Sequence, residues 1–375
     1  MVSLPDTHHA LVLSSLDAPL EVKSIAAPEL IPGSAIVQVL SSPVLAYAAK
    51  LYSGALQYPL HPPMTVGGGA IGRIVAVGSD ATHLAPGQLV LVDPMIRGRD
   101  DPAKSILLGV HGGLSEGAAR LMKGDWRDGS CAEFARWPLE NIHALDEDKL
   151  KDGLGYSHHE MAYIIRFLVP MGGLAELDVR AGDRVVIAPA TGQFGGAAVE
   201  VALALGADVV ICGRKKDVLE GMKATLGPVY PRSRIDAVAL SGTVDTDVAA
   251  IQHAGPVDKY LDFSPAAAAG STHITSCLMS LRKGGRACFQ GGIAQPVPIP
   301  YLHVMFNDLV IGGKFMYERE AIRRAIALVE SGRLRFELPG LKAFGLREWR
   351  DAFAAAERNG GWRQMVVLEP AKQST

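Results

Sequence analysis

The chain has 375 residues, 48% hydrophobic and 20% charged, which is an ordinary globular composition for two or three domains. Its 37 Lys and Arg residues nearly balance 39 Asp and Glu residues, so charge gives no general reason to expect binding to nucleic acid or to a membrane. The four cysteines form no CxxC motif, and neither a secretion signal nor a long apolar run is present. We therefore expect a cytoplasmic protein with reduced thiols and no membrane anchor.

Residues 1–140 contain short apolar segments separated by Gly and Pro turns, a pattern that predicts β-strands. The expected strands are 9–13, 20–25, 35–40, 69–77, 89–93 and 131–137. Many short strands at this spacing are typical of an irregular barrel. A connection over residues 94–128 is rich in Gly, Asp and Arg, and we expect it to be a long functional or mobile loop.

Residues 141–178 change to a helical pattern, in which Ser157 and Glu160 form a candidate capping box. From residue 181 onward, strands and helices alternate. The segments 184–188, 192–205 and 208–212 make one strand–helix–strand unit. Further strands are expected at 259–263, 286–290 and 364–368, and helices at 319–330 and 349–357. This alternation predicts an α/β fold with a doubly wound parallel sheet.

The turn between the first strand and helix of that unit resembles a dinucleotide-binding fingerprint. Its residues are Ala190, Thr191, Gly192, Gln193, Phe194 and Gly195. Gly192 fits the glycine that lets backbone approach a pyrophosphate, and Gly195 the one that lets the helix pack on the strand. The helix N-terminus then offers free N–H groups and a positive dipole end to that anion. The alternative is a glycine-rich turn in a protein that binds no nucleotide.

The end of the second strand predicts which dinucleotide binds. An NAD site carries Asp or Glu about 20 residues past the glycines, to bind the ribose hydroxyls. Here Arg214 and Lys215 occupy that place, and a guanidinium can grip a 2′-phosphate in a bidentate manner. The pattern therefore favours NADP(H), although these basic residues would also suit a solvated loop.

Over its whole length the chain resembles the medium-chain dehydrogenase/reductase superfamily. The resemblance is carried mainly by residues 65–78, 181–214 and 362–368. It is nearest to the zinc-lacking branch of quinone and enoyl reductases, and residues 93–137 look like a fungal alcohol-dehydrogenase-like group. The resemblance implies a GroES-like irregular β-barrel catalytic domain (1–165, completed by 313–375) and a doubly wound Rossmann NADP-binding domain (166–312). It also implies an active site in the cleft between them.

The zinc ligands of the family have no counterpart in this sequence. Alignment places Leu45 where zinc members have a Cys, and Gly68 where they have a His. The third ligand, a Cys, would fall within residues 166–170, which contain none, and the Cys cluster of the structural zinc lobe is missing. Leu and Gly cannot bind zinc, so we expect no metal.

Without a metal, a substrate carbonyl must be polarised by hydrogen-bond donors. The same alignment places Tyr47 and Lys50 where zinc members have their proton relay, so we expect Tyr47 to donate a proton and Lys50 to support it. Tyr52 and Tyr58 are competing candidates from the same region. Alternatively, these tyrosines line an aromatic pocket and no side chain is essential.

Later strand ends add candidate cofactor contacts. Phe263 and Ser264 follow one strand, and Gly291 and Gly292 follow the next; the family contacts the nicotinamide half from such ends. Gly291 would allow the ring to approach closely. Lys314 is a candidate for the cofactor phosphates, or else a surface lysine.

These expectations describe an NADP(H)-dependent, zinc-independent oxidoreductase acting on a small-molecule substrate. An activated C=C acceptor is slightly favoured, because a conjugated acceptor needs less Lewis-acid help, and carbonyl reduction or alcohol oxidation follows closely. A non-catalytic NADPH-binding protein, like the lens crystallins of the superfamily, is the alternative from another class. We expect no nucleic-acid or membrane partner, and a homodimer as the default assembly.

Overall fold

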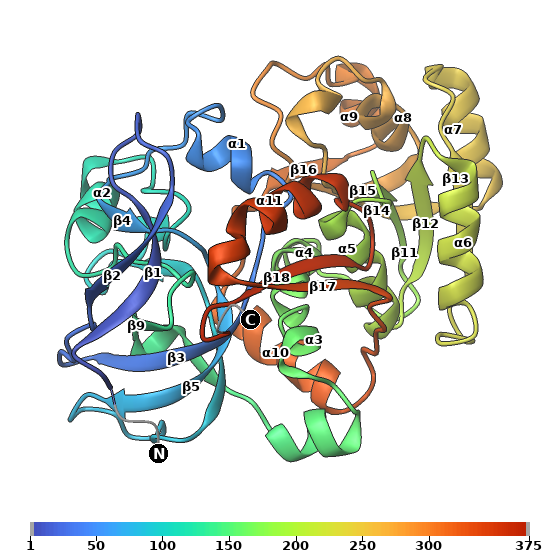
Figure 1. The fold of residues 1–375 in the computed structure, drawn as a ribbon. Helices are drawn as coiled ribbons and strands as arrows, with labels where there is room; N and C mark the ends of the chain where they lie inside the picture. Colours follow the sequence, from blue (N-terminus) through green and yellow to red (C-terminus); the bar gives the residue numbers. More distant parts are fainter. Residues whose placement is uncertain (1–3, 373–375) are drawn as a thin grey trace. The chain divides into compact units, whose positions relative to one another are not determined.

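The computed structural model describes residues 4–372, which divide into two compact units. The first unit runs to Ile165 and adds Glu337–Gly360 and the segment from Gln364 onward. The second contains Arg166–Phe336 and the short segment Gly361–Arg363. Figure 1 follows the chain through both units.

The first unit is built from mostly antiparallel strands, as expected of a GroES-like domain. A three-stranded sheet has the order β2-β1-β4, and a seven-stranded sheet has the order β10-β6-β5-β3-β18-β17, with β9 also paired to β3. The strands are β1 Thr7–Leu13, β2 Glu21–Ala26, β3 Ser34–Pro43, β4 Met64–Thr65, β5 Ala70–Val77, β6 Leu89–Val92, β9 Phe134–Pro138, β10 Ile142–Ala144, β17 Gly340–Gly345 and β18 Gln364–Glu369. The predicted strands are confirmed, with shifts of a few residues at their ends.

The connection over residues 94–128 is not one long loop. It contains a hairpin of β7 (Met95–Arg97) and β8 (Ser105–Leu107), followed by α2 (Glu116–Lys123). Ile96 and Ile106 face each other across the hairpin and are both buried. Ser115 begins α2, because its Oγ accepts the N–H of Ala118 at 3.2 Å. These elements were not predicted, because the Gly and Asp residues between them gave the segment the composition of a loop.

Short helices complete the first unit. They are α1 Ala48–Tyr52, a π-helix Asp148–Gly153, α3 His158–Met161 and α11 Trp349–Arg358. The predicted capping box at α3 is confirmed: Ser157 Oγ accepts the N–H of Glu160, and the Glu160 carboxylate accepts the N–H of Ser157.

The second unit contains one parallel sheet with the order β13-β12-β11-β14-β15-β16. This is the doubly wound Rossmann order, so the predicted fold class is confirmed. The strands are β11 Arg184–Ala188, β12 Asp208–Gly213, β13 Ile235–Ala239, β14 Val257–Asp262, β15 Leu281–Phe289 and β16 Val310–Gly313. The helices are α4 Ile164–Glu176, α5 Gln193–Ala204, α6 Lys216–Leu226, α7 Val244–His253, α8 His273–Met279, α9 Tyr301–Phe306 and α10 Arg319–Glu330. Every residue of β11 is buried, which explains the apolar run from Val185 to Ala188 that follows Arg184.

The chain remains in the second unit for longer than expected after β16. Residues 313–336 belong to this unit rather than to the first. Tyr317 packs against α4, where a Cβ added to Gly172 would lie 2.8 Å from the Tyr317 Cβ. Phe336 contacts Phe167 of the same helix, with ring centroids 5.5 Å apart. The expected return at residue 313 is therefore corrected to the segment after Phe336.

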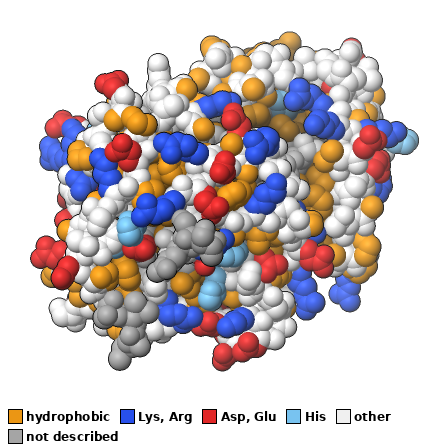
Figure 2. Space-filling model, viewed as in Figure 1, with side chains coloured by type: hydrophobic (Ala, Val, Ile, Leu, Met, Phe, Trp, Pro, Cys, Tyr) orange, Lys and Arg blue, Asp and Glu red, His pale blue; other side chains and the backbone are white. Residues whose placement is uncertain are grey.

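Three general features concern the described residues of both units. None of the helices in residues 4–372 has the length and apolarity needed to cross a membrane. On the face drawn in Figure 2, positive and negative side chains of the described residues are interspersed. The four cysteines are buried and carry no disulfide.

Candidate active site

The strand order of the second unit reverses between β11 and β14. In open α/β sheets, ligands bind at the carboxyl ends of the strands that flank such a switch point. There the Phe263 N–H donates to the Ala188 carbonyl at 3.0 Å, so the residues after β14 lie beside those after β11. The structure thus brings the predicted fingerprint and the predicted Phe263–Ser264 contact to one edge of the sheet.

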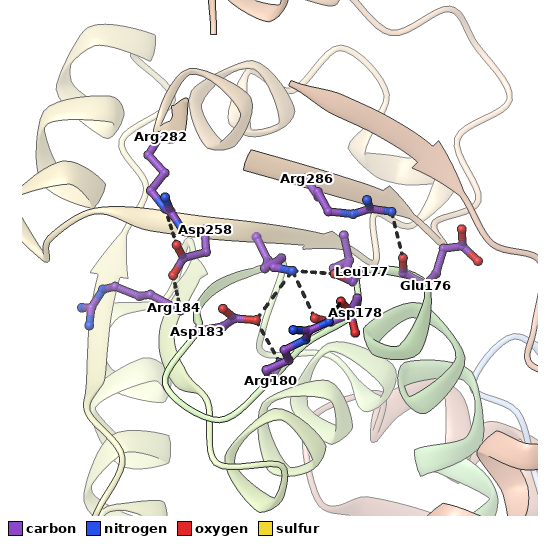
Figure 3. Close-up of polar contacts among 10 residues, drawn as sticks. Glu176, Leu177, Asp178, Arg180, Asp183, Arg184, Asp258, Arg282 and Arg286 are labelled. Atoms are coloured by element: carbon purple, nitrogen blue, oxygen red, sulfur yellow. Dashed lines mark hydrogen bonds and ion pairs between the residues drawn. The ribbon is translucent and has the colours of Figure 1, made fainter. Parts of the chain in front are cut away.

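The opposite edge of this sheet is occupied by ion pairs between protein groups (Figure 3). Asp258 binds the Arg184 N–H and the Arg282 guanidinium. The Arg184 side chain also pairs with Asp236. Lys259 Nζ donates to the Leu177 carbonyl at 2.7 Å. These contacts join the starts of the strands to one another and to the segment after α4, and we assign this edge a structural role.

The two fingerprint glycines have different environments. A Cβ on Gly195 would overlap the carbonyl of Pro189, so close packing of α5 on the β11 turn requires glycine there. Gly192 has φ −83°, a value that any residue adopts, and a Cβ added there would meet no atom within 4 Å. Neither backbone strain nor a neighbour in the described chain explains Gly192. The open space beside it is compatible with a bound pyrophosphate.

The N-terminus of α5 supplies the donors for such an anion. Gly192 is its N-cap residue and has no side chain to accept the first N–H groups of the helix. Gln193 is buried and Phe194 half-buried, with the Arg166 guanidinium 5.4 Å from the Phe194 ring centre. The helix therefore points the positive end of its dipole at the open space beside Gly192.

Ala190 and Thr191 connect this turn to the end of β12. The Ala190 N–H donates to the Cys212 carbonyl at 2.8 Å. The Thr191 side chain lies 3.3 Å from where a Cβ on Gly213 would be. Arg214 follows directly, so the fold places the predicted phosphate-binding residue next to the fingerprint.

Arg214 and Lys215 are exposed and immediately precede α6. Neither makes a hydrogen bond or ion pair with any residue in 4–372. Lys215 is the N-cap residue of α6, which adds a second helix N-terminus to this region. Two unpaired cations at a helix start suit a phosphate.

Protein neighbours alter the interpretation of two of the other predicted cofactor residues, Lys314 and Gly291. Lys314 Nζ lies 2.9 Å from a Glu318 oxygen and 3.8 Å from a Glu176 oxygen, which weakens its predicted role at the phosphates. A Cβ on Gly291 would lie 2.6 Å from a carboxylate oxygen of Asp262, so packing between β14 and β15 explains this glycine without a ligand. Gly292 keeps open space around its Cα.

Sequence reasoning missed a returning segment at the fingerprint. The Trp362 N–H donates to the Thr191 carbonyl at 3.0 Å, and Gly361 forms a β-bridge with Gly192. Arg363 makes a buried ion pair with Glu200 of α5 at 2.9 Å. The only signal in the sequence was the similarity of residues 362–368 to the family ending.

The Tyr52 hydroxyl is hydrogen-bonded to two backbone groups. It donates to the Gly109 carbonyl and accepts the Gly67 N–H, both at 3.0 Å. Burial raises the Tyr52 pKa far above its usual range. Tyr52 therefore holds two loops together, which argues against it as a proton donor.

Lys50 does not support Tyr47 in the way we expected. Its Nζ forms an ion pair with Glu357 of α11 at 3.1 Å, and both side chains are largely exposed. The one-turn helix α1 directs Lys50 toward α11, while Tyr47 precedes the helix as its N-cap residue.

Tyr47, Tyr58 and His111 form one aromatic cluster. The Tyr47 and Tyr58 ring centroids are 6.5 Å apart, and those of Tyr58 and His111 are 5.0 Å apart. His111 Nδ1 accepts the Gly113 N–H at 3.0 Å, so a neutral ring carries its proton on Nε2. Burial lowers the His111 pKa and raises the Tyr58 pKa, which keeps both as neutral donors near pH 7. His111 is not among the catalytic residues predicted from the sequence.

The residues present do not fit the family's catalytic zinc. Leu45 packs against the hydrophobic core of the first unit. A Cβ on Gly68 would contact the Val110 side chain at 3.4 Å. Cys131 lies beside Gly67, and its Sγ is 3.7 Å from Ser42 Oγ. Within residues 4–372, His, Cys, Asp and Glu form no group of three that could hold a metal.

Comparisons with known proteins agree with this architecture. A model of the alcohol dehydrogenase GroES-like domain matches residues 31–147. L-arabinitol 4-dehydrogenase of Aspergillus oryzae is 24% identical over 367 residues, which cover 94% of this chain and 90% of that protein. The chain is thus similar to an alcohol dehydrogenase domain in its first unit and to a dehydrogenase over most of its length.

Solved structures show the same fold at low identity. The crystal structure of AibC superposes with a TM-score of 0.78 at 19% identity, covering 98% of this chain and 97% of that one. A putative zinc-binding dehydrogenase from Sinorhizobium meliloti 1021, solved with NADP bound, gives a TM-score of 0.75 at 20% identity, covering 98% and 100%. The fold of these structures thus extends over both units of the chain.

Proposed function

We propose that this protein is a zinc-independent, NADP(H)-dependent oxidoreductase of the medium-chain type. It would transfer a hydride to or from an activated C=C or a carbonyl group of a small organic substrate. The observation that carries the proposal is Gly192, which the fold does not require but which leaves open space at the N-terminus of α5. Arg214 beside it, exposed and unpaired within the described chain, supports NADP(H) over NAD(H).

The residues of the chain would divide the work as follows. The N–H groups at the start of α5 hold the pyrophosphate, and Arg214 with Lys215 holds the 2′-phosphate. When bound, the nicotinamide supplies or accepts the hydride. Tyr47, Tyr58 and His111 offer neutral O–H and N–H donors, of which we favour Tyr47 as the group that transfers the substrate proton.

A second candidate reaction is alcohol oxidation or ketone reduction. It is favoured by the relative named L-arabinitol 4-dehydrogenase, whose name implies an alcohol substrate. A conjugated enone needs less polarisation than an isolated carbonyl, so the donors described above favour C=C reduction.

Steady-state assays distinguish these reactions. The purified chain is incubated with NADPH and, in turn, enones, quinones, aldehydes and ketones, and with NADP⁺ and polyols. We expect turnover with one class and a preference for NADPH over NADH. Tight NADPH binding without any turnover would instead support a non-catalytic binding protein, and absence of NADPH binding would refute the proposal.

Zinc independence is tested separately by chelation. After treatment with a strong chelator, activity should remain unchanged and elemental analysis should find less than one zinc per chain. Loss of activity that added zinc restores would overturn this part of the proposal.

We also propose a homodimer formed through the edge strand β16. Seven of the twelve large hydrophobic side chains exposed in the described chain lie between residues 299 and 315: Ile299, Tyr301, Leu302, Met305, Phe306, Val310 and Phe315. The strand β16 ends the six-stranded sheet, so its outer backbone groups are available to pair. Under a two-fold axis an edge strand pairs with its own copy, which would also cover these side chains.

A further inference from the structure

A buried polar cluster at the carboxyl end of β14 has no role in the proposals above. It consists of Tyr260, Asp262, Ser264, Ser271 and His273, which we call the His273 cluster. Tyr260, Asp262, Ser264 and His273 are each at most 5% exposed. Buried polar side chains are costly unless their hydrogen bonds are satisfied, so a cluster of this size requires an explanation.

The hydrogen bonds of the cluster form a chain that starts at α8. Ser271 Oγ lies 2.8 Å from His273 Nδ1, and His273 Nε2 lies 2.7 Å from Ser264 Oγ. Ser264 Oγ donates in turn to Asp262 Oδ1. Because the Ser264 hydroxyl gives its proton to the carboxylate, it must accept one from His273 Nε2.

Asp262 is the acceptor on which the cluster converges. Besides Ser264 Oγ, the Tyr260 hydroxyl donates to Oδ1 at 2.9 Å and the Ser264 N–H donates to Oδ2 at 3.1 Å. Three donors around one carboxylate satisfy most of its acceptor sites and fix the backbone from residue 262 to 264.

That backbone is also bound to both neighbouring strands. The Phe263 N–H donates to Ala188 at the end of β11. On the other side, the Gln290 N–H donates to the Asp262 carbonyl and the Gly292 N–H donates to the Ser264 carbonyl, at 3.0 Å and 2.8 Å. Any shift of Ser264 would therefore move the ends of β14 and β15 together.

We propose that His273 is a positioning residue for the nicotinamide half of the dinucleotide. Acting through Ser264 and Asp262, it holds in place the ends of β14 and β15, which carry Phe263 and Gly292. The end of β14 lies beside the fingerprint turn, because Phe263 is hydrogen-bonded to Ala188. The proposal rests on the proposed function, because it assumes that a dinucleotide binds at this edge. The proposal does not involve the part of the site at Arg214. Arg214 follows β12, which is separated from β14 by β11.

The test compares two ligands that share the adenosine 2′-phosphate half of the dinucleotide. NADPH reports on both halves of the site, whereas adenosine 2′,5′-bisphosphate lacks the nicotinamide. Binding of each is titrated to wild type and to His273→Asn and His273→Gln. The Gln amide can reach Ser264 as His273 Nε2 does, but the shorter Asn amide cannot. His253→Ala, on an exposed side chain at the end of α7, is the control.

We expect His273→Asn to weaken NADPH binding about tenfold and leave binding of the bisphosphate within about twofold of wild type. His273→Gln should restore most of the NADPH affinity. Equal loss for both ligands would indicate a merely structural role and would overturn the proposal, as would unchanged NADPH binding. If wild type binds neither ligand, the proposed function itself fails and the role of His273 fails with it.

Discussion

Arg214 is the residue whose charge bears most directly on the choice of dinucleotide. Arg214→Asp replaces a cation with a carboxylate that would repel a 2′-phosphate and suit ribose hydroxyls. We expect NADPH affinity to fall about tenfold or more and NADH affinity to be spared, measured by titration of each. Arg232→Asp, an exposed residue of the same unit, makes the same charge change as a control. Unchanged selectivity would refute the phosphate role.

Tyr47 is the residue on which the catalytic proposal depends. Tyr47→Phe removes the hydroxyl but keeps the ring against Tyr58, so kcat should fall about tenfold or more while the affinity for NADPH stays constant. Lys50→Met should have no effect, because Lys50 pairs with Glu357. A wild-type rate for Tyr47→Phe excludes Tyr47, and a loss seen only in Tyr58→Phe would transfer the role to Tyr58.

At the scale of elements, the strand starts of the Rossmann sheet depend on Arg184. Its guanidinium is buried and links β11 to Asp236 on β13, with Asp208 of β12 at 3.7 Å. Arg184→Met should lower the free energy of unfolding by about 2 kcal/mol in urea titrations, because two carboxylates lose a buried partner. Arg180→Met breaks the exposed ion pair with Asp178 and should leave the free energy of unfolding unchanged. Equal effects of the two variants would contradict this interpretation.

The π-helix of the first unit begins after an ion pair with β5. Arg73 makes two hydrogen bonds to Glu147, at 2.9 and 3.0 Å, and these lower the Glu147 pKa below its usual 4.5. A carboxyl with a lowered folded-state pKa stabilises the fold above its unfolded value, and this gain is lost as the pH falls through the lowered pKa.

Glu147→Gln should therefore lower the thermal midpoint at pH 7, and its difference from wild type should shrink as the pH falls below 4.5. Thermal melts of both proteins across this pH range measure the difference. Glu116→Gln, in an exposed pair with Arg120, is the matched control. A difference that is constant with pH would exclude the ion pair as its cause.

At the scale of the whole molecule, the exposed apolar segment over residues 299–315 predicts self-association. Light scattering of the protein as it elutes from a size-exclusion column should give twice the chain mass of 39.7 kDa. Phe306→Asp combined with Val310→Lys should yield a monomer, because the charges would be buried at the dimer contact. Leu114→Asp, at a side chain that is 93% exposed in the first unit, should remain dimeric. A monomeric wild type would refute the dimer.

Local patterns predicted most elements but not their partners. The helices expected at 319–330 and 349–357 are present as α10 and α11, because their apolar residues recur at helical spacing. The hairpin β7–β8 was missed, because three-residue strands carry too few residues for alternation to be recognised. Functions were predicted for Lys50 and Lys314 from their positions in the sequence. In the structure both form ion pairs with residues that are distant in the sequence, Lys50 with Glu357 and Lys314 with Glu176.

The sequence by itself determined the fold class, the fingerprint turn and the basic residues after β12, because each depends on neighbours along the chain or on one strand–helix–strand unit. Only the tertiary structure decided which glycines face open space, that Tyr52 is bound by backbone, and that His273 reaches Asp262 through Ser264. Hydrogen bonds and packing act over a few ångströms in space, and the segments that they join can be far apart in the sequence.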